Sequence, residues 1–193
     1  MPTKKIVITG GPCSGKSAVK WELQLRGYYV VYEAALAIIG SQKYEKGNIF
    51  PTTHPEEFQR EVYWLQILWE DEIPKNVKIA YLDRCIYDSI AYLKSKNLPV
   101  SKEWEEEMKK RHYDIILFLE MLPKEYWVKT ETGKPRFKTY EEGAEDTRNI
   151  KEFYERLSHT LDIELIHIPV IIPVKKRVDF IEECLESIAP SGI

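Results

Sequence analysis

The feature that most constrains this chain is a glycine-rich segment close to its start, Gly10-Gly11-Pro12-Cys13-Ser14-Gly15-Lys16-Ser17. An apolar run over residues 6–9 precedes it, and residues 15–26 follow it with the spacing of an amphipathic helix. Glycines allow a loop to curl without Cβ clashes, so that successive backbone N–H groups can point at one anion. The pattern Gly-x-x-x-x-Gly-Lys-Ser between a strand and a helix therefore predicts a phosphate-binding loop, or P-loop.

The two polar residues that end this motif have different expected roles. Lys16 reaches the β- and γ-phosphates of a nucleoside triphosphate, and the Ser17 hydroxyl is placed to ligate Mg²⁺. The helix that begins near Gly15 adds unpaired N–H groups and the positive end of its dipole. We therefore expect Gly10 to Ser17 to bind ATP or GTP together with Mg²⁺.

Composition and charge narrow the class of protein further. The chain has 193 residues and a net charge of −3, which gives no electrostatic basis for an obligatory nucleic-acid partner. No apolar run approaches the roughly 18 residues that span a bilayer, and the first predicted strand leaves no room for a signal peptide. The three cysteines show no Cys-x-x-Cys spacing, which favours a reducing cytoplasm. We expect one cytoplasmic domain over residues 1–193.

Strand and helix patterns alternate along the chain. We expect strands over residues 5–9, 28–32, 77–82, 115–119 and 164–168. Helical spacing predicts helices over residues 15–26, 34–39, 87–95, 101–112, 141–160 and 174–188. A further helix is expected to start at the capping signal Thr53 to Glu56 and to stop before Pro74. This alternation predicts an α/β, three-layer P-loop NTPase fold, a five-stranded parallel sheet with helices on both faces. Ligands then bind beyond the carboxyl ends of the strands.

Charged side chains follow two of the other predicted strands. Glu33, after the second strand, could accept a proton from a substrate hydroxyl or hold Mg²⁺ through water, or be a solvated glutamate. After the third strand, Asp83 is placed to orient Mg²⁺ and Arg84 to pair with substrate or phosphate, the alternative being a structural ion pair. Asp88 and Tyr92, four residues apart on one helical face, either line an acceptor pocket or position Arg84.

The segment after the fourth strand, at about residues 123–148, is predicted to be a lid over the phosphates. Between residues 123 and 140 it carries four lysines and one arginine against two glutamates. A basic segment beyond a strand end suits a cover that closes over bound phosphates. Arg136 and Arg148 are the candidates to neutralise charge on a transferring phosphoryl group. A solvated charged loop is the alternative.

The predicted helix before Pro74 carries amides and aromatic rings among its apolar positions: Gln59, Tyr63, Trp64 and Gln66. In a nucleoside-binding cleft such groups could read and stack on a base. Aromatic residues at helical spacing are nevertheless more often part of the core. The four histidines show no ligand spacing such as His-Glu-x-x-His, so neither a zinc site nor a catalytic histidine is expected.

Three segments carry a resemblance to a known family: Ile-Thr-Gly-Gly-Pro-Cys-Ser-Gly-Lys-Ser, Tyr-Val-Val-Tyr-Glu-Ala-Ala and Asp-Arg-Cys-Ile-Tyr-Asp-Ser-Ile-Ala-Tyr. The chain resembles the AAA-type P-loop family related to the ribosylnicotinamide kinase domain of NadR and, more distantly, deoxynucleoside and thymidylate kinases. The resemblance implies phosphate binding by Gly10 to Ser17, a base or metal role for Glu33, a metal or acceptor role for Asp83 and Arg84, and lid arginines near Arg136 and Arg148.

Two departures from the family pattern concern the acceptor side. The family often has an arginine two residues after the strand-two glutamate, where this chain has Ala35. It often has Asp-Gly-x-Arg in the lid, where this chain has Thr-Gly-Lys-Pro-Arg at residues 132–136. Both departures leave the phosphoryl acceptor open.

The function predicted from the sequence is a Mg²⁺- and ATP-dependent kinase with a nucleoside- or nucleotide-like small-molecule acceptor. The alternative is a regulatory NTPase that hydrolyses ATP or GTP slowly and binds a macromolecular partner. No Asn-Lys-x-Asp segment is present, which favours ATP over GTP. The chain also lacks the additional small helical domain of ring-forming motors, which disfavours a hexameric machine.

Overall fold

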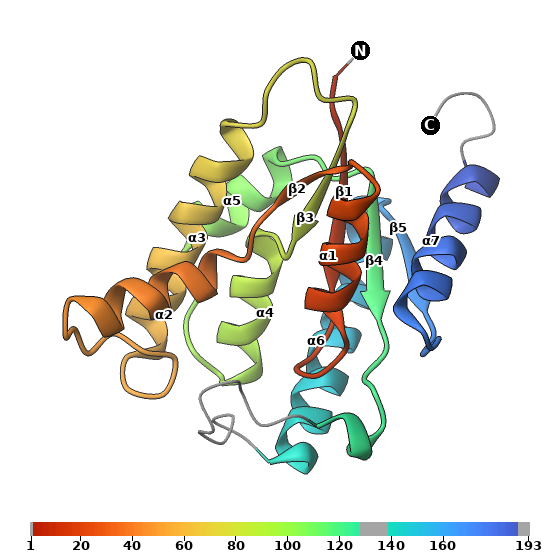
Figure 1. Cartoon of the computed structure of the whole chain (residues 1–193). Helices are drawn as coiled ribbons and strands as arrows, with labels where there is room; N and C mark the ends of the chain where they lie inside the picture. Colours follow the sequence, from red (N-terminus) through yellow and green to blue (C-terminus); the bar gives the residue numbers. More distant parts are fainter. Residues whose placement is uncertain (1, 128–138, 189–193) are drawn as a thin grey trace.

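The structure, a computed structural model, describes residues 2–127 and 139–188, and their five strands form one parallel sheet in the order β2-β3-β1-β4-β5 (Figure 1). The strands are β1 (Lys4–Thr9), β2 (Tyr29–Val31), β3 (Ile79–Asp83), β4 (Ile115–Leu119) and β5 (Glu164–Ile168). The order places β1 at the centre, paired with β3 on one side and β4 on the other. The connections therefore change direction across the sheet beside β1, and the crevice that such a reversal opens lies at the carboxyl end of β1.

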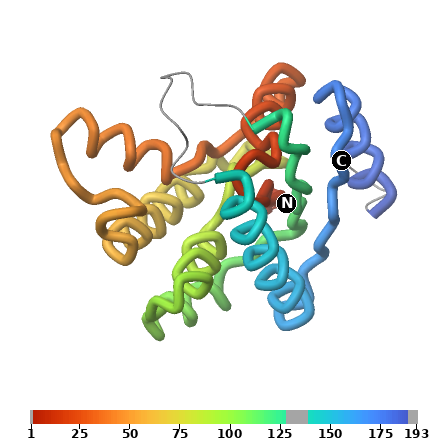
Figure 2. The backbone as a smooth tube through the Cα atoms, turned by 90° about the horizontal axis from the view of Figure 1, so that it is seen from below, coloured from red at the N-terminus to blue at the C-terminus, as the bar shows by residue number. Residues whose placement is uncertain are grey.

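Helices cover both faces of this sheet. They are α1 (Lys16–Leu25), α2 (Ala34–Tyr44), α3 (Pro55–Asp71), α4 (Ile86–Ser95), α5 (Lys102–Lys110), α6 (Tyr140–Leu161) and α7 (Val174–Ile188), with a short 3₁₀ helix η1 (Lys124–Tyr126). Helices α1 and α7 contact each other over one face, and α4 packs between α3 and α6 over the other (Figures 1 and 2). The predicted three-layer α/β fold with a five-stranded parallel sheet is confirmed.

The inner strands are mostly apolar where helices bury them on both sides, and all five residues of β4 are buried. Alternate side chains point to opposite faces and so join two separate core clusters. One cluster, between the sheet and helices α1 and α7, includes Ile6, Ile8, Leu117, Val178 and Ile181. The other, beneath α3 to α6, includes Val7, Leu82, Ile116, Tyr63 and Tyr154. The carboxyl ends of β1 and β4, where the chain leaves the sheet, are therefore held in fixed positions.

Two local predictions differ from the structure. Helix α2 continues to Tyr44 rather than stopping at residue 39. Helix α3 starts at Pro55 with His54 as its N-cap, so the capping role predicted for Thr53 is wrong. The Thr53 hydroxyl instead donates to the carbonyls of Asn48 and Phe50 in the preceding turn. Proline suits the first helical position because its φ is fixed near the helical value and that position needs no N–H donor.

Within residues 2–127 and 139–188, no helix combines the length and the apolar character needed to cross a membrane.

The buried centre of the sheet provides a test of this packing. Leu117 on β4 is 0% exposed, whereas Leu25 on α1 is 80% exposed. We expect Leu117→Ala to lower the free energy of unfolding by about 3 kcal/mol, because it removes buried methyl groups and leaves a cavity. The matched control Leu25→Ala should change it by less than about 0.5 kcal/mol. Urea denaturation followed by circular dichroism measures both, and equal losses would contradict the described core.

Candidate nucleotide-binding site

The glycine-rich loop runs from the end of β1 to the start of α1, at the carboxyl edge of the sheet (Figure 1). Glycine is required at its first two positions for different reasons. Gly10 has a φ of 137°, and a Cβ atom there would lie 2.5 Å from the carbonyl oxygen of Leu119. A Cβ atom on Gly11 would overlap the side chain of Thr147 on α6. The loop is thus enclosed by the end of β4 and by α6, and a larger residue at either position would displace it.

Lys16 is folded back over this loop. Its Nζ donates to the carbonyl oxygens of Gly10 at 3.0 Å and Gly11 at 2.7 Å, and to the Ser14 hydroxyl at 3.0 Å. Burial and the positive charge of Arg84 lower the pKa of Lys16 to about 7, although nearby carboxylates oppose this shift. The loop thus holds a poorly solvated cation whose acceptors are neutral carbonyls and a hydroxyl, which an anionic phosphate would replace with a stronger partner.

The parallel register of β1 and β3 brings Asp83 next to the P-loop. Ile8 pairs with Asp83, and the Arg84 N–H donates to the Ile8 carbonyl at 3.0 Å. Asp83 Oδ2 accepts from Lys20 Nζ of α1 at 2.9 Å, and both side chains are buried. Asp83 Oδ1 is also buried and has no hydrogen-bond partner within the described part of the chain.

These oxygens fit a Mg²⁺ ion held jointly by protein and nucleotide. Ser17 is exposed at the first turn of α1, and the unpartnered Oδ1 of Asp83 lies on the adjacent strand end. Mg²⁺ prefers hard oxygen ligands and is commonly bound by only one or two side chains, with water and phosphate oxygens completing its shell. The role of Ser17 and Asp83 in holding such an ion stays a prediction.

Arg84 is the centre of a second group of charges. Its Nε donates to Glu33 Oε1 at 3.0 Å and its Nη1 to Asp88 Oδ1 at 2.8 Å. Its guanidinium carbon lies 5.4 Å from the ring centre of Tyr92. Burial opposes the charge, but Tyr92, Glu33 and the neighbouring aspartates raise the pKa of Arg84 well above its ordinary value. Arg84 is therefore a permanent cation between β2 and α4.

Asp88 fixes the position of this arginine. Its carboxylate also accepts from the Thr9 hydroxyl at 2.7 Å, the Tyr154 hydroxyl at 2.8 Å and the Cys85 N–H at 3.1 Å. Arg84 itself has a φ of 75°, a left-handed conformation that is unfavourable for a non-glycine residue and is maintained by these contacts. Of the two roles considered for Asp88, the contacts support positioning of Arg84.

The amides and rings predicted on α3 divide between core and site. Tyr63 stacks on Trp104 with ring centres 4.1 Å apart and donates to the Trp104 carbonyl, so it belongs to the core. Gln66 donates to Glu70 and to the Arg84 carbonyl, which supports the β3–α4 connection. Gln59 is buried, whereas Trp64 is 44% exposed. The interpretation of the aromatic pattern as core is thus correct for Tyr63 but not for Trp64.

The predicted lid is only partly covered by the described residues. Arg136 lies outside them. Arg148 is an exposed residue of α6, directly after Thr147, which borders Gly11 of the P-loop. Lys124 of η1 and Glu141 of α6 form an ion pair of 2.7 Å across the two ends of the segment. The structure therefore places the residue before Arg148 against the loop, and the role of Arg148 in phosphate binding stays a prediction.

Sequence reasoning missed two cations at the site. Lys20 follows Lys16 by one helical turn, a spacing that could have indicated its position beside the loop. Arg177 on α7 is 2% exposed, and its Nη1 donates to the Ser14 carbonyl at 2.6 Å. Arg177 lies 163 residues after Ser14 in the sequence, so no local pattern could have indicated this contact.

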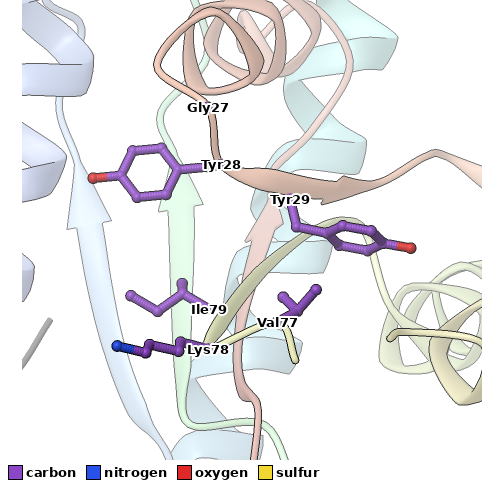
Figure 3. Close-up of a pocket in the computed structure, with 6 residues that line it drawn as sticks. All are labelled: Gly27, Tyr28, Tyr29, Val77, Lys78 and Ile79. Carbon is purple, nitrogen blue, oxygen red and sulfur yellow. The ribbon is translucent and has the colours of Figure 1, made fainter. Parts of the chain in front are cut away.

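A hollow elsewhere on the molecule is not part of this site. It has a volume of about 470 Å³ and is lined by residues 27–29 and 77–79, at the amino ends of β2 and β3 (Figure 3). Tyr28 and Tyr29 point to opposite sides of the chain there (Figure 3). This end of a parallel sheet is opposite to the end where the P-loop and the charged groups lie.

The family of the chain follows from a comparison with sequence families. A family described as an AAA domain matches residues 5–170, and the chain belongs to that family. A search of curated proteins found no match.

Solved structures of nucleoside and nucleotide kinases share the fold. Deoxyadenosine kinase from M. mycoides, solved with dCMP and dCDP, has a TM-score of 0.67 at 17% identity over 95% of this chain and 99% of the kinase. NadR in complex with NR has a TM-score of 0.67 at 15% identity over 99% of this chain and 52% of NadR. Thymidylate kinase from Candida albicans has a TM-score of 0.60 at 15% identity over 96% of this chain and 92% of that enzyme. The fold is that of the P-loop kinases.

The lowered pKa of Lys16 predicts a specific pH dependence of stability. A lysine with an ordinary pKa of 10.5 loses its proton near pH 7 in the folded protein, so the unfolded chain binds more protons between these values. The contribution of Lys16 to the free energy of unfolding therefore rises with pH over this window, by at most about 1.4 kcal/mol per unit. We expect the stability of the wild type relative to Lys16→Met to increase between about pH 7 and about pH 9.5. Urea titrations without nucleotide measure this difference, and a constant or falling difference would refute the assignment.

Proposed function

We propose that this protein is a Mg²⁺-dependent phosphotransferase that moves the γ-phosphoryl group of ATP to a nucleoside- or nucleotide-like small molecule. The observation that carries the proposal is the Glu33–Arg84 pair, 3.0 Å between Nε and Oε1, next to the P-loop. A carboxylate and a fixed guanidinium beside a phosphate-binding loop are the groups that can orient an acceptor molecule for phosphoryl transfer. A protein that only binds or hydrolyses a nucleotide does not require such groups.

On the donor side, the residues act by position and charge. Backbone N–H groups of Gly10 to Ser17 hold the phosphates, and Lys16 leaves its loop carbonyls to bind the β- and γ-oxygens. Ser17 and the unpartnered oxygen of Asp83 would hold Mg²⁺, which would supply positive charge to the phosphates during transfer. Arg148, and Arg136 of the predicted lid, supply further positive charge to the transferring group.

On the acceptor side, Glu33 orients the attacking hydroxyl and accepts its proton. Arg84 holds the Glu33 carboxylate in one direction and leaves its guanidinium able to contact the acceptor. Asp88 stabilises that arrangement from the side away from Glu33. The deoxyadenosine kinase was solved with dATP and NadR with NR, so acceptors that carry a ribose or deoxyribose hydroxyl are the first to test.

The experiment measures ADP formation with ATP and Mg²⁺ across nucleosides, nucleoside monophosphates and ribosylnicotinamide. We expect ADP formation to depend on at least one of these acceptors. Glu33→Gln should then lower kcat by about a hundredfold to ten-thousandfold, because general-base positioning is worth that much, while the Kd for ATP stays the same. Glu45→Gln, an exposed glutamate just beyond α2, is the matched control and should retain full activity.

Two results would overturn the proposal. Slow release of phosphate into water at one rate with every acceptor would show that no transfer occurs. Full turnover by Glu33→Gln with a confirmed acceptor would show that the acceptor site lies elsewhere. Lys16→Ala, which should lose ATP binding while the protein stays folded, verifies that any turnover comes from the P-loop.

A further inference from the structure

Arg177 of α7 joins three segments at the carboxyl edge of the sheet. Its Nη1 donates to the Ser14 carbonyl of the P-loop at 2.6 Å. Its Nη2 donates to the carbonyls of Glu120, just after β4, and Ile168, the last residue of β5, both at 3.1 Å. All three acceptors are neutral backbone groups, and the side chain is almost fully buried.

Arg177 donates to backbone carbonyls rather than to a carboxylate within the described part of the chain, although the charge of Glu120 is near enough to favour its protonated form. The Glu120 carboxylate is itself paired: its Oε1 lies 2.7 Å from Lys151 Nζ and 3.4 Å from His167 Nδ1. The Nε of Arg177 is buried without a hydrogen-bond partner among the described residues. Burial lowers the pKa of Arg177 to about 10, although the negative charge of Glu120 opposes this shift. A buried cation whose hydrogen bonds go only to neutral carbonyls is destabilising, so its presence behind the P-loop requires a reason.

The geometry of one peptide group supplies that reason. The Ser14 carbonyl points toward Arg177, and in a planar trans peptide the N–H of the next residue points the opposite way. That next residue is Gly15, the N-cap of α1, and no described residue accepts a hydrogen bond from its N–H. A Cβ atom on Gly15 would lie 3.2 Å from Arg177 Nη1, so the glycine permits the close approach. By holding the carbonyl, Arg177 fixes the direction of a free N–H donor at the start of α1.

We propose that Arg177 is a positioning residue of the P-loop, which turns the Ser14–Gly15 peptide toward bound phosphate and provides a buried positive charge that the phosphate neutralises. It acts through the loop and does not itself touch the nucleotide. The inference rests on the nucleotide binding in the proposed function, and adds that α7 takes part in it from behind the loop.

The test measures binding of tripolyphosphate and of ATP, each with Mg²⁺, by isothermal titration calorimetry. Arg177→Gln removes the charge, and Arg177→Lys keeps the charge but not the forked set of donors. Lys176→Gln makes the same charge change at an exposed residue one position earlier on α7 and is the matched control. We expect Arg177→Gln to weaken both ligands by a similar factor of about ten to a hundred, Arg177→Lys by less, and Lys176→Gln by less than about twofold.

The outcomes separate the inference from the proposed function. If Arg177→Gln bound tripolyphosphate and ATP as tightly as Lys176→Gln does, the inference would be overturned and the proposed function would not. So would a loss for ATP without a loss for tripolyphosphate, because Arg177 would then act on the nucleoside end. A wild-type protein that binds neither ligand would overturn the proposed function and the inference with it. If Arg177→Gln does not fold, Arg177→Lys decides: binding like the wild type contradicts the role of the forked donors in orienting the peptide.

Discussion

The parallel register of β1 with β3 is the constraint on which the site depends. It aligns Ile8 with Asp83 and brings the Arg84 N–H to the Ile8 carbonyl, so that the P-loop and the Asp83-Arg84 pair leave the sheet side by side. A shift of one residue would turn the buried side chains of β3 to the opposite face. The two core clusters on either side of the sheet oppose such a shift. Packing far from the site therefore fixes the distance between the P-loop and the Asp83-Arg84 pair.

The charges at the site fall into two groups with different consequences. Lys20 with Asp83, and Arg84 with Glu33 and Asp88, are ion pairs that are complete within the protein. Lys16 and Arg177 donate instead to backbone carbonyls and a hydroxyl, and burial lowers the pKa of each. The first group holds the charged side chains that follow β2 and β3 in fixed positions. The second leaves two buried cations around the loop that a phosphate anion would neutralise, which favours binding of a polyphosphate.

Local patterns were sufficient to predict the elements, but not all of the site. The strands over residues 115–119 and 164–168 have the predicted bounds, the first because it is a continuous apolar run that is buried along its whole length. The places of the P-loop, Glu33 and Asp83-Arg84 could be predicted because each lies at or just beyond the carboxyl end of a strand, while their roles stay predictions. The contact of Arg177 with Ser14 joins residues far apart in the sequence, and only packing of α7 against α1 creates it. Likewise, the Thr53 hydroxyl bonds the preceding turn, a choice that its sequence neighbours do not reveal.

The central claim is that this loop exchanges its own carbonyls for the phosphates of a nucleotide. A crystal structure with Mg²⁺ and a non-hydrolysable ATP analogue tests it most directly. The account predicts that Lys16 Nζ leaves the Gly10 and Gly11 carbonyls and contacts the β- and γ-phosphates, with the γ-phosphate facing Glu33 and Arg84. An analogue bound elsewhere, with Lys16 still on those carbonyls, would contradict it.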